Sequence, residues 1–270
     1  MMKDILVHLD SDERCVSRLD IAADLAVRFG ARLLGLFAQA ESDGPSLVAR
    51  RMSAHLGAAA DQAHHLFETR TAGRGLRTRW MQLSHGEAGH VVAETAFCAR
   101  YADLTVLGQW HERAHVPAEF AEQVILQSGR PTLVIPQIGW TNGIGRRVAI
   151  AWNASRESSR AVHDGLPMLK EAEEVFLLAV REPVTQHTPH DSLPKVEIAD
   201  HLASHGIAVT AERLATDEIG VMDALLSRAF DLGADLLVMG AHSGIGLSFL
   251  RGSGTRFILR HMTLPVMMSN

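Results

Sequence analysis

The chain has 270 residues, about twice a common domain length of roughly 100–150, so one large domain or two smaller ones both fit. Its hydrophobic fraction of 47% and charged fraction of 21% are ordinary for a globular protein, and the net charge of −5 gives no basic footprint for nucleic acid. The two cysteines have no metal-type spacing, no apolar run approaches the ~20 residues that cross a bilayer, and no signal-peptide pattern is present. The sequence therefore predicts a cytoplasmic protein that binds neither nucleic acid nor membrane.

Short apolar runs alternate with longer segments of helical period along the whole chain. In the first half we expect strands at 4–9, 32–38, 76–83, 103–108 and 131–136, with helices between them at 15–29, 46–70, 87–101 and 117–127. In the second half we expect strands at 146–152, 174–180, 206–213, 235–240 and 264–268, with helices at 156–170, 193–205, 217–232 and 254–261. This alternation predicts an α/β fold with a parallel sheet covered on both faces. Ligands bind such a sheet beyond the carboxyl ends of its strands, where the strand order reverses.

Three segments of the first half return in the second half, in the same order. Residues 5–10 resemble 148–153, residues 103–108 resemble 235–240, and residues 131–136 resemble 265–269, at offsets between 132 and 143 residues. Any α/β protein has several apolar strands, but the shared Asp-(apolar)4-Gly pattern and the later proline argue against coincidence. The repeat predicts two tandem domains, 1–138 and 146–270, joined by a glycine-rich polar connection at 137–145.

The turn after the strand at 235–240 contains five glycines within residues 240–255. Glycine lets backbone N–H groups approach an anion closely, and the helix that follows offers its free N–H groups and the positive end of its dipole. The turn is neither a Walker P-loop nor a Rossmann fingerprint, so a glycine-rich surface loop remains the alternative. The candidate phosphate-binding residues are Gly240, His242, Ser243, Gly244, Gly252, Ser253, Gly254 and Thr255.

These features resemble the universal stress protein (UspA-like) family. The resemblance rests on the tandem halves, the strand end at 238–240, Gly252-Ser253, and the segments 259–261 and 264–266. It implies two five-stranded parallel sheets, Rossmann-like and similar to adenine nucleotide α-hydrolase folds, related by a pseudo-two-fold axis. Many members of this family bind ATP or AMP through a Gly-x2-Gly-x9-Gly-Ser/Thr motif.

The motif is irregular in this chain. Three residues instead of two separate Gly240 from Gly244, and the spacing of nine is kept only between Gly244 and Gly254. The resemblance implies that ATP or AMP, with or without Mg²⁺, lies over strand ends contributed by Ala151, Trp152, Asn153 and Ala179. Family members often have aspartate where this chain has Asn153, and the amide brings no charge toward a metal. Trp152 could stack on a ligand or pack in the core.

The first half departs further from the family pattern. The turn at 109–120 lacks glycine and carries two acidic residues, so we expect a degenerate repeat without a phosphate cradle. We expect Asp10-Ser11 and Asn153-Ala-Ser155 to cap the first helix of each half. By the resemblance, the closing strands of the two halves associate and form an intramolecular pseudo-dimer, and a homodimer stays open as a further possibility.

The sequence thus favours a nucleotide-binding protein of the stress response, with no catalytic residue and no metal ligand assigned. A slow ATPase or phosphoryl-transfer enzyme is one alternative, although the chain lacks a P-loop lysine. An interaction scaffold that works without nucleotide is the other.

Overall fold

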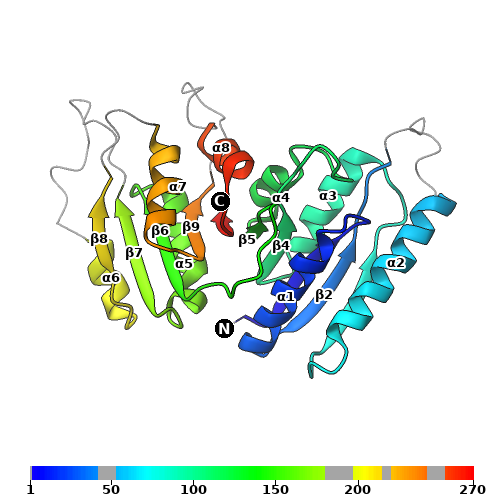
Figure 1. Ribbon diagram of the computed structural model, residues 1–270, viewed down its shortest axis with the longest axis horizontal. Helices are drawn as coiled ribbons and strands as arrows, with labels where there is room; N and C mark the ends of the chain where they lie inside the picture. The colour runs from blue at the N-terminus through cyan, green and yellow to red at the C-terminus, as the bar shows by residue number, and fades with distance from the viewer. Residues whose placement is uncertain (1, 42–52, 180–196, 215–219, 242–252) are drawn as a thin grey trace.

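The computed structural model describes residues 2–41, 53–179, 197–214, 220–241 and 253–270 (Figure 1). The described residues form an α/β fold with ten strands and eight helices, as the sequence predicts. Helix and strand alternate throughout, apart from the direct step from β5 to β6 that joins the two halves of the chain.

In the first half, the observed elements lie close to the expected ranges. They are β1 (Asp4–Leu9), α1 (Cys15–Phe29), β2 (Arg32–Phe37), α2 (Ala54–Thr71), β3 (Thr78–Gln82), α3 (Ala88–Ala99), β4 (Leu104–Gly108), α4 (Phe120–Ser128) and β5 (Thr132–Ile135). Helix α2 begins later than the expected residue 46, and residues 42–52 lie outside the described ranges.

The second half repeats the same order. It comprises β6 (Arg147–Trp152), α5 (Arg156–Leu169), β7 (Glu174–Ala179), α6 (Ile198–Ser204), β8 (Thr210–Arg213), α7 (Val221–Asp231), β9 (Leu236–Gly240), α8 (Ser253–His261) and β10 (Val266–Ser269). Strand β8 is shorter than the expected 206–213.

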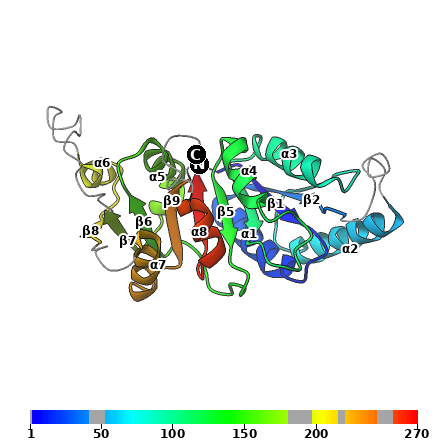
Figure 2. The same ribbon diagram turned by 90° about the horizontal axis from the view of Figure 1, so that it is seen from above.

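All ten strands belong to one sheet with the order β3-β2-β1-β4-β5-β10-β9-β6-β7-β8. Neighbouring strands within each half are parallel, whereas β5 and β10 pair antiparallel through Thr132–Val134 and Val266–Met268. The two halves therefore have the same strand order, running outward from the β5–β10 junction (Figure 2). Because β5 and β10 pair with each other, neither is left as an unpaired edge.

The helices cover both faces of the sheet. One core cluster gathers buried residues of α1, α2, α5 and α6, and the other gathers those of α3, α4, α7 and α8. Strands β1, β4 and β5 are buried almost completely, as expected for parallel strands covered on both sides. Helices α4 and α8 lie side by side over the β5–β10 junction (Figures 1 and 2).

The repeated aspartate of the sequence pattern has the same structural role in both halves. Asp103 Oδ2 accepts hydrogen bonds from the backbone N–H groups of Lys3, at 2.6 Å, and Asp4, at 3.0 Å. Asp235 accepts from the backbone N–H groups of Gly145, at 2.6 Å, and Arg146, at 3.0 Å. In each half this carboxylate fixes the start of the first strand beside the strand that follows the aspartate.

One of the two predicted helix caps is wrong. Ser155 caps α5, since its hydroxyl accepts a hydrogen bond from the Ser158 N–H at 3.1 Å. Helix α1 instead begins after Arg14 without a side-chain cap. Asp10 is turned inward to Arg18, because a buried guanidinium needs a carboxylate partner.

Candidate functional site

The carboxyl ends of β6, β7 and β9 meet at one edge of the second half. Strand β6 pairs with β7 on one side and with β9 on the other. The chain leaves β6 toward β7 and later returns to the opposite side of β6, so the strand order reverses between β6 and β9. Open α/β sheets bind their ligands at such a reversal, which makes this edge the candidate site.

The turn from β6 into α5 forms one wall of this edge. Asn153 is exposed, and its Oδ1 accepts a hydrogen bond from the Ser155 N–H at 3.1 Å. Ala154 has a φ of +58°, and among the described residues it is the one non-glycine residue with positive φ. A left-handed alanine costs roughly 1–2 kcal/mol, so the turn that contains Asn153 is held in a strained shape at this edge.

Gly240, at the end of β9, lies directly against the start of α5. A Cβ atom at this position would be 2.5 Å from the Glu157 carbonyl carbon and 2.6 Å from the Ser158 nitrogen. Only glycine lets the strand end and the helix start approach so closely. Gly240 therefore brings the N-terminus of α5, with the positive end of its dipole, to the reversal point.

Helix α8 starts at the same edge, since it follows β9. Gly254 is its second residue, and the space beside its α-carbon is open except for Met222 Sδ and Cε, each 3.4 Å from an ideal Cβ. Thr255 is 2% exposed, so its hydroxyl lies inside the protein and not on its surface. His242, Ser243, Gly244 and Gly252 lie outside the described residues, as does the side chain of Ser253.

The remaining predicted site residues lie at the ends of β6 and β7. Trp152 is half-buried and packs against the core cluster, which favours its core role over a freely exposed stacking surface. Ala151 and Ala179 are also half-buried. The Ala179 carbonyl already accepts a hydrogen bond from the Leu214 N–H at 3.1 Å.

The equivalent edge of the first half is filled by the protein itself. Arg18 Nη2 donates to Asp10 Oδ1 at 3.2 Å and to Cys15 Sγ at 2.7 Å, and all three side chains are buried. Arg18 Nη1 would be 2.3 Å from a Cβ atom on Gly108, the residue that corresponds to Gly240 in the sequence repeat. A guanidinium thus stands over the end of β4, where the second half has the start of α5 over the end of β9.

Burial and charge change the acid–base behaviour of this cluster. Burial opposes ionisation of Asp10, but the charges of Arg18 and His8 outweigh it and lower its pKa to about 2. Burial and the Arg18 charge lower the pKa of His8 to about 4. Burial raises the pKa of the Cys15 thiol to about 12, which leaves it protonated and unreactive at neutral pH. The first half therefore holds one buried ion pair and a neutral histidine.

A small cavity of about 30 Å³ remains beside this cluster, lined by His8, Arg18, Gln109 and His111 among others. His8 Nδ1 and Arg18 Nε are buried next to it without a hydrogen-bond partner. A cavity of this volume accommodates one or two water molecules and is far too small for a nucleotide. Sequence reasoning missed this cluster, because an arginine eight residues after an aspartate carries no pattern of its own.

Comparison with known proteins identifies the second half. Residues 145–270 match the family model described as the Universal stress protein family. Over these residues, the second half of the chain is similar to this family. No curated protein matches the chain.

Two solved universal stress proteins match along the whole chain. The structure from Archaeoglobus fulgidus DSM 4304 is 15% identical with a TM-score of 0.71, and the match covers 99% of this chain and 98% of that one. A putative universal stress protein from Pseudomonas aeruginosa UCBPP-PA14 is also 15% identical, with a TM-score of 0.57 and coverage of 99% and 93%. At these identities the matches show that both halves share the fold of universal stress proteins.

A universal stress protein from Archaeoglobus fulgidus, solved in complex with dAMP, matches half of the chain. It is 16% identical with a TM-score of 0.36, and the match covers 50% of this chain and 97% of that one.

Within the described ranges of the present chain, no three His, Cys, Asp or Glu side chains are placed to hold a metal ion. None of the helices in those ranges is long and apolar enough to span a bilayer.

Proposed function

We propose that the C-terminal half of this chain binds an adenine nucleotide, ATP or AMP, and that the N-terminal half does not. Binding would make the protein a nucleotide-responsive regulator in the cytoplasmic stress response. The observation that carries the proposal is that α5 and α8, on opposite faces of the sheet, follow the adjacent strands β6 and β9, between which the strand order reverses. Helix N-termini at such a point are suited to phosphate.

Different residues would bind the phosphates and the nucleoside of the ligand. The N–H groups at the start of α8, around Ser253 and Gly254, would bind phosphate oxygens, helped by the helix dipole. The exposed Asn153 amide would hydrogen-bond to the ribose or the base, and Trp152 would border the base with the part of its ring that is not packed in the core. Any Mg²⁺ would be held by the phosphates of ATP, because the neutral side chain of Asn153 brings no negative charge to the ion.

The domain ranges proposed from the sequence, 1–138 and 146–270, divide the chain between β5 and β6. Each unit then has its own reversal point, and we propose that only the second binds a ligand. In the first, the Arg18 guanidinium occupies the strand ends and the adjoining cavity of about 30 Å³ is too small. We therefore expect one nucleotide per chain.

A charge placed at the start of α8 tests the proposal without weakening the fold. In Gly254→Asp, the new carboxylate would stabilise the helix through its dipole and repel phosphate. Gly89→Asp is the matched control, because Gly89 is also the second residue of its helix, α3, and has no neighbouring atom within 4 Å. Titration calorimetry with ATP and AMP, with and without Mg²⁺, is the measurement.

The proposal predicts that the wild-type protein and Gly89→Asp bind with the same affinity, and that Gly254→Asp binds at least about tenfold more weakly with an unchanged or higher melting temperature. Gly254→Ala should bind like the wild-type protein. A wild-type protein that takes up neither nucleotide would refute the proposal, as would a Gly254→Asp variant with wild-type affinity.

A further inference from the structure

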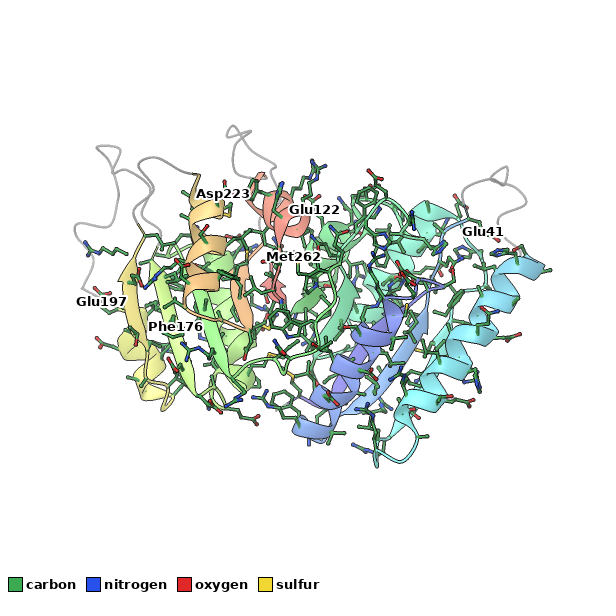
Figure 3. All side chains as sticks on the ribbon, in the orientation of Figure 1. Glu41, Glu122, Phe176, Glu197, Asp223 and Met262 are labelled. Carbon is green, nitrogen blue, oxygen red and sulfur yellow. The ribbon has the colours of Figure 1, made fainter. Side chains whose placement is uncertain are left out.

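Helix α8 belongs to the C-terminal half, yet residues of the N-terminal half hold it at both ends. Near its start, Arg256 Nε donates to both carboxylate oxygens of Glu122 on α4, at 2.9 and 2.7 Å (Figure 3 labels Glu122). In its last turn, the Arg260 carbonyl accepts a hydrogen bond from Gln109 Nε2 at 3.0 Å. Gln109 is itself fixed, since its Oε1 accepts from the Gln137 N–H at 2.7 Å.

The contact between Glu122 and Arg256 is asymmetric in exposure. The Glu122 side chain is 7% exposed, whereas that of Arg256 is 62% exposed. A carboxylate that is almost buried needs its charged partner, because an unpaired buried charge is strongly unfavourable. Arg256 therefore stays at Glu122, although its guanidinium has free access to solvent.

The other sides of α8 are fixed by the C-terminal half. Ile258 is fully buried in the core, and Met262, just after the helix, is 3% exposed. Met222 of α7 lies beside Gly254 in the first turn. The first turn of α8 thus lies between α7 of its own half and α4 of the other half, so the direction of its free N–H groups depends on both (Figure 2).

We infer that Glu122 is a positioning residue for the nucleotide site: by holding Arg256 it sets the place of the α8 N-terminus and hence the affinity of the C-terminal half for adenine nucleotide. This inference rests on the proposed function. It gives the N-terminal half, which has no room for a nucleotide, a part in binding one. Through the same contact, nucleotide binding at the start of α8 would also affect the position of α4.

A double-mutant cycle tests the inference. Glu122→Gln, Arg256→Gln and the double variant are compared with the wild-type protein for ATP affinity and for hydrogen exchange of the backbone amides at 253–261. Asp20→Asn is the matched control, since Asp20 pairs with Arg70 of α2 and with Arg74 just after this helix, within the N-terminal half. If Glu122→Gln does not fold, Arg256→Gln still tests the same contact, because it breaks the ion pair at the exposed partner.

We expect each single variant to raise the Kd for ATP about fivefold, with the double variant no weaker than either one, because both changes break one contact. Exchange at 253–261 should rise in the same variants and stay unchanged in Asp20→Asn. Unchanged exchange at 253–261, an unchanged Kd, or additive losses in the double variant would overturn the inference. If the wild-type protein bound no ATP, the proposed function would fail, and the exchange data alone would decide whether Glu122 positions α8.

Discussion

Glu122 and Arg256 stand at the same place in the two halves, each nine residues before the proline that precedes the last strand of its half, and they pair with each other. Two identical halves meeting at this position would bring together either two carboxylates or two guanidinium groups, which repel. The junction therefore fits one N-terminal half and one C-terminal half. The two halves also differ at their strand ends, since the Arg18 guanidinium stands over the end of β4 and the start of α5 stands over the end of β9.

Removal of the Asp10 charge should destabilise the N-terminal half. Asp10→Asn keeps the shape of the side chain but leaves the buried Arg18 guanidinium without its counter-charge. Breaking a buried ion pair from one side costs about 3–5 kcal/mol, so we expect the free energy of unfolding in urea to fall by about 3 kcal/mol.

The matched control for this change is Asp24→Asn, which removes one of the two partners of Arg74 on the surface, where the Asp24 side chain is 72% exposed. Exposed pairs contribute little, so its unfolding free energy should stay within about 0.5 kcal/mol of wild type. Equal effects of the two substitutions would show that Arg18 does not depend on Asp10.

His8 should make the stability depend on pH. Its pKa is about 4 in the folded protein and 6.5 ordinarily, so between these values the unfolded chain binds a proton that the folded protein refuses. The stability is then full above pH 6.5 and is lost as the pH falls toward 4, by roughly 3 kcal/mol in total. His8→Gln removes this titration and keeps a donor toward the Ala38 carbonyl, to which His8 Nε2 lies at 2.6 Å.

The measurement is the free energy of unfolding between pH 7 and pH 4 for both proteins. The wild-type protein should lose roughly 3 kcal/mol more than His8→Gln across this range, because the other titrating groups are common to both. Parallel curves would contradict the assignment of a buried neutral histidine.

Gly240→Ala should disturb the start of α5. Its Cβ would meet backbone atoms of Glu157 and Ser158 at 2.5 and 2.6 Å, so the helix start must move, at a cost of about 1–3 kcal/mol. Gly89→Ala, a helical glycine with open surroundings, should be neutral or stabilising. Thermal unfolding of the two variants compares them directly, and a Gly240→Ala protein as stable as wild type would contradict the close approach.

The repeat and the hydrophobic periodicity predicted most of the fold. The strands expected at 4–9 and 174–180 were predictable as short, nearly continuous apolar runs, and the helix at 15–29 was predictable from apolar residues at helical spacing. The pairing of β5 with β10 was expected only through the family resemblance, since nothing in a single strand indicates which partner covers it.

The site was less predictable, because it depends on contacts between distant residues. The sequence indicated Gly240 as a phosphate ligand, whereas its visible role is to admit the start of α5. Asp10 was predicted to cap α1, but the buried Arg18 takes its carboxylate. Ser155 was predicted correctly, since a cap is decided by residues within one turn.

One adenine nucleotide should bind per chain, at the start of α8. Native mass spectrometry of the full chain with excess ATP counts bound nucleotides in the wild-type protein, Gly254→Asp and Gly89→Asp. We expect one nucleotide on the wild-type protein and on Gly89→Asp, and none on Gly254→Asp at the same concentration. Two nucleotides per chain, or one that persists in Gly254→Asp, would contradict this expectation.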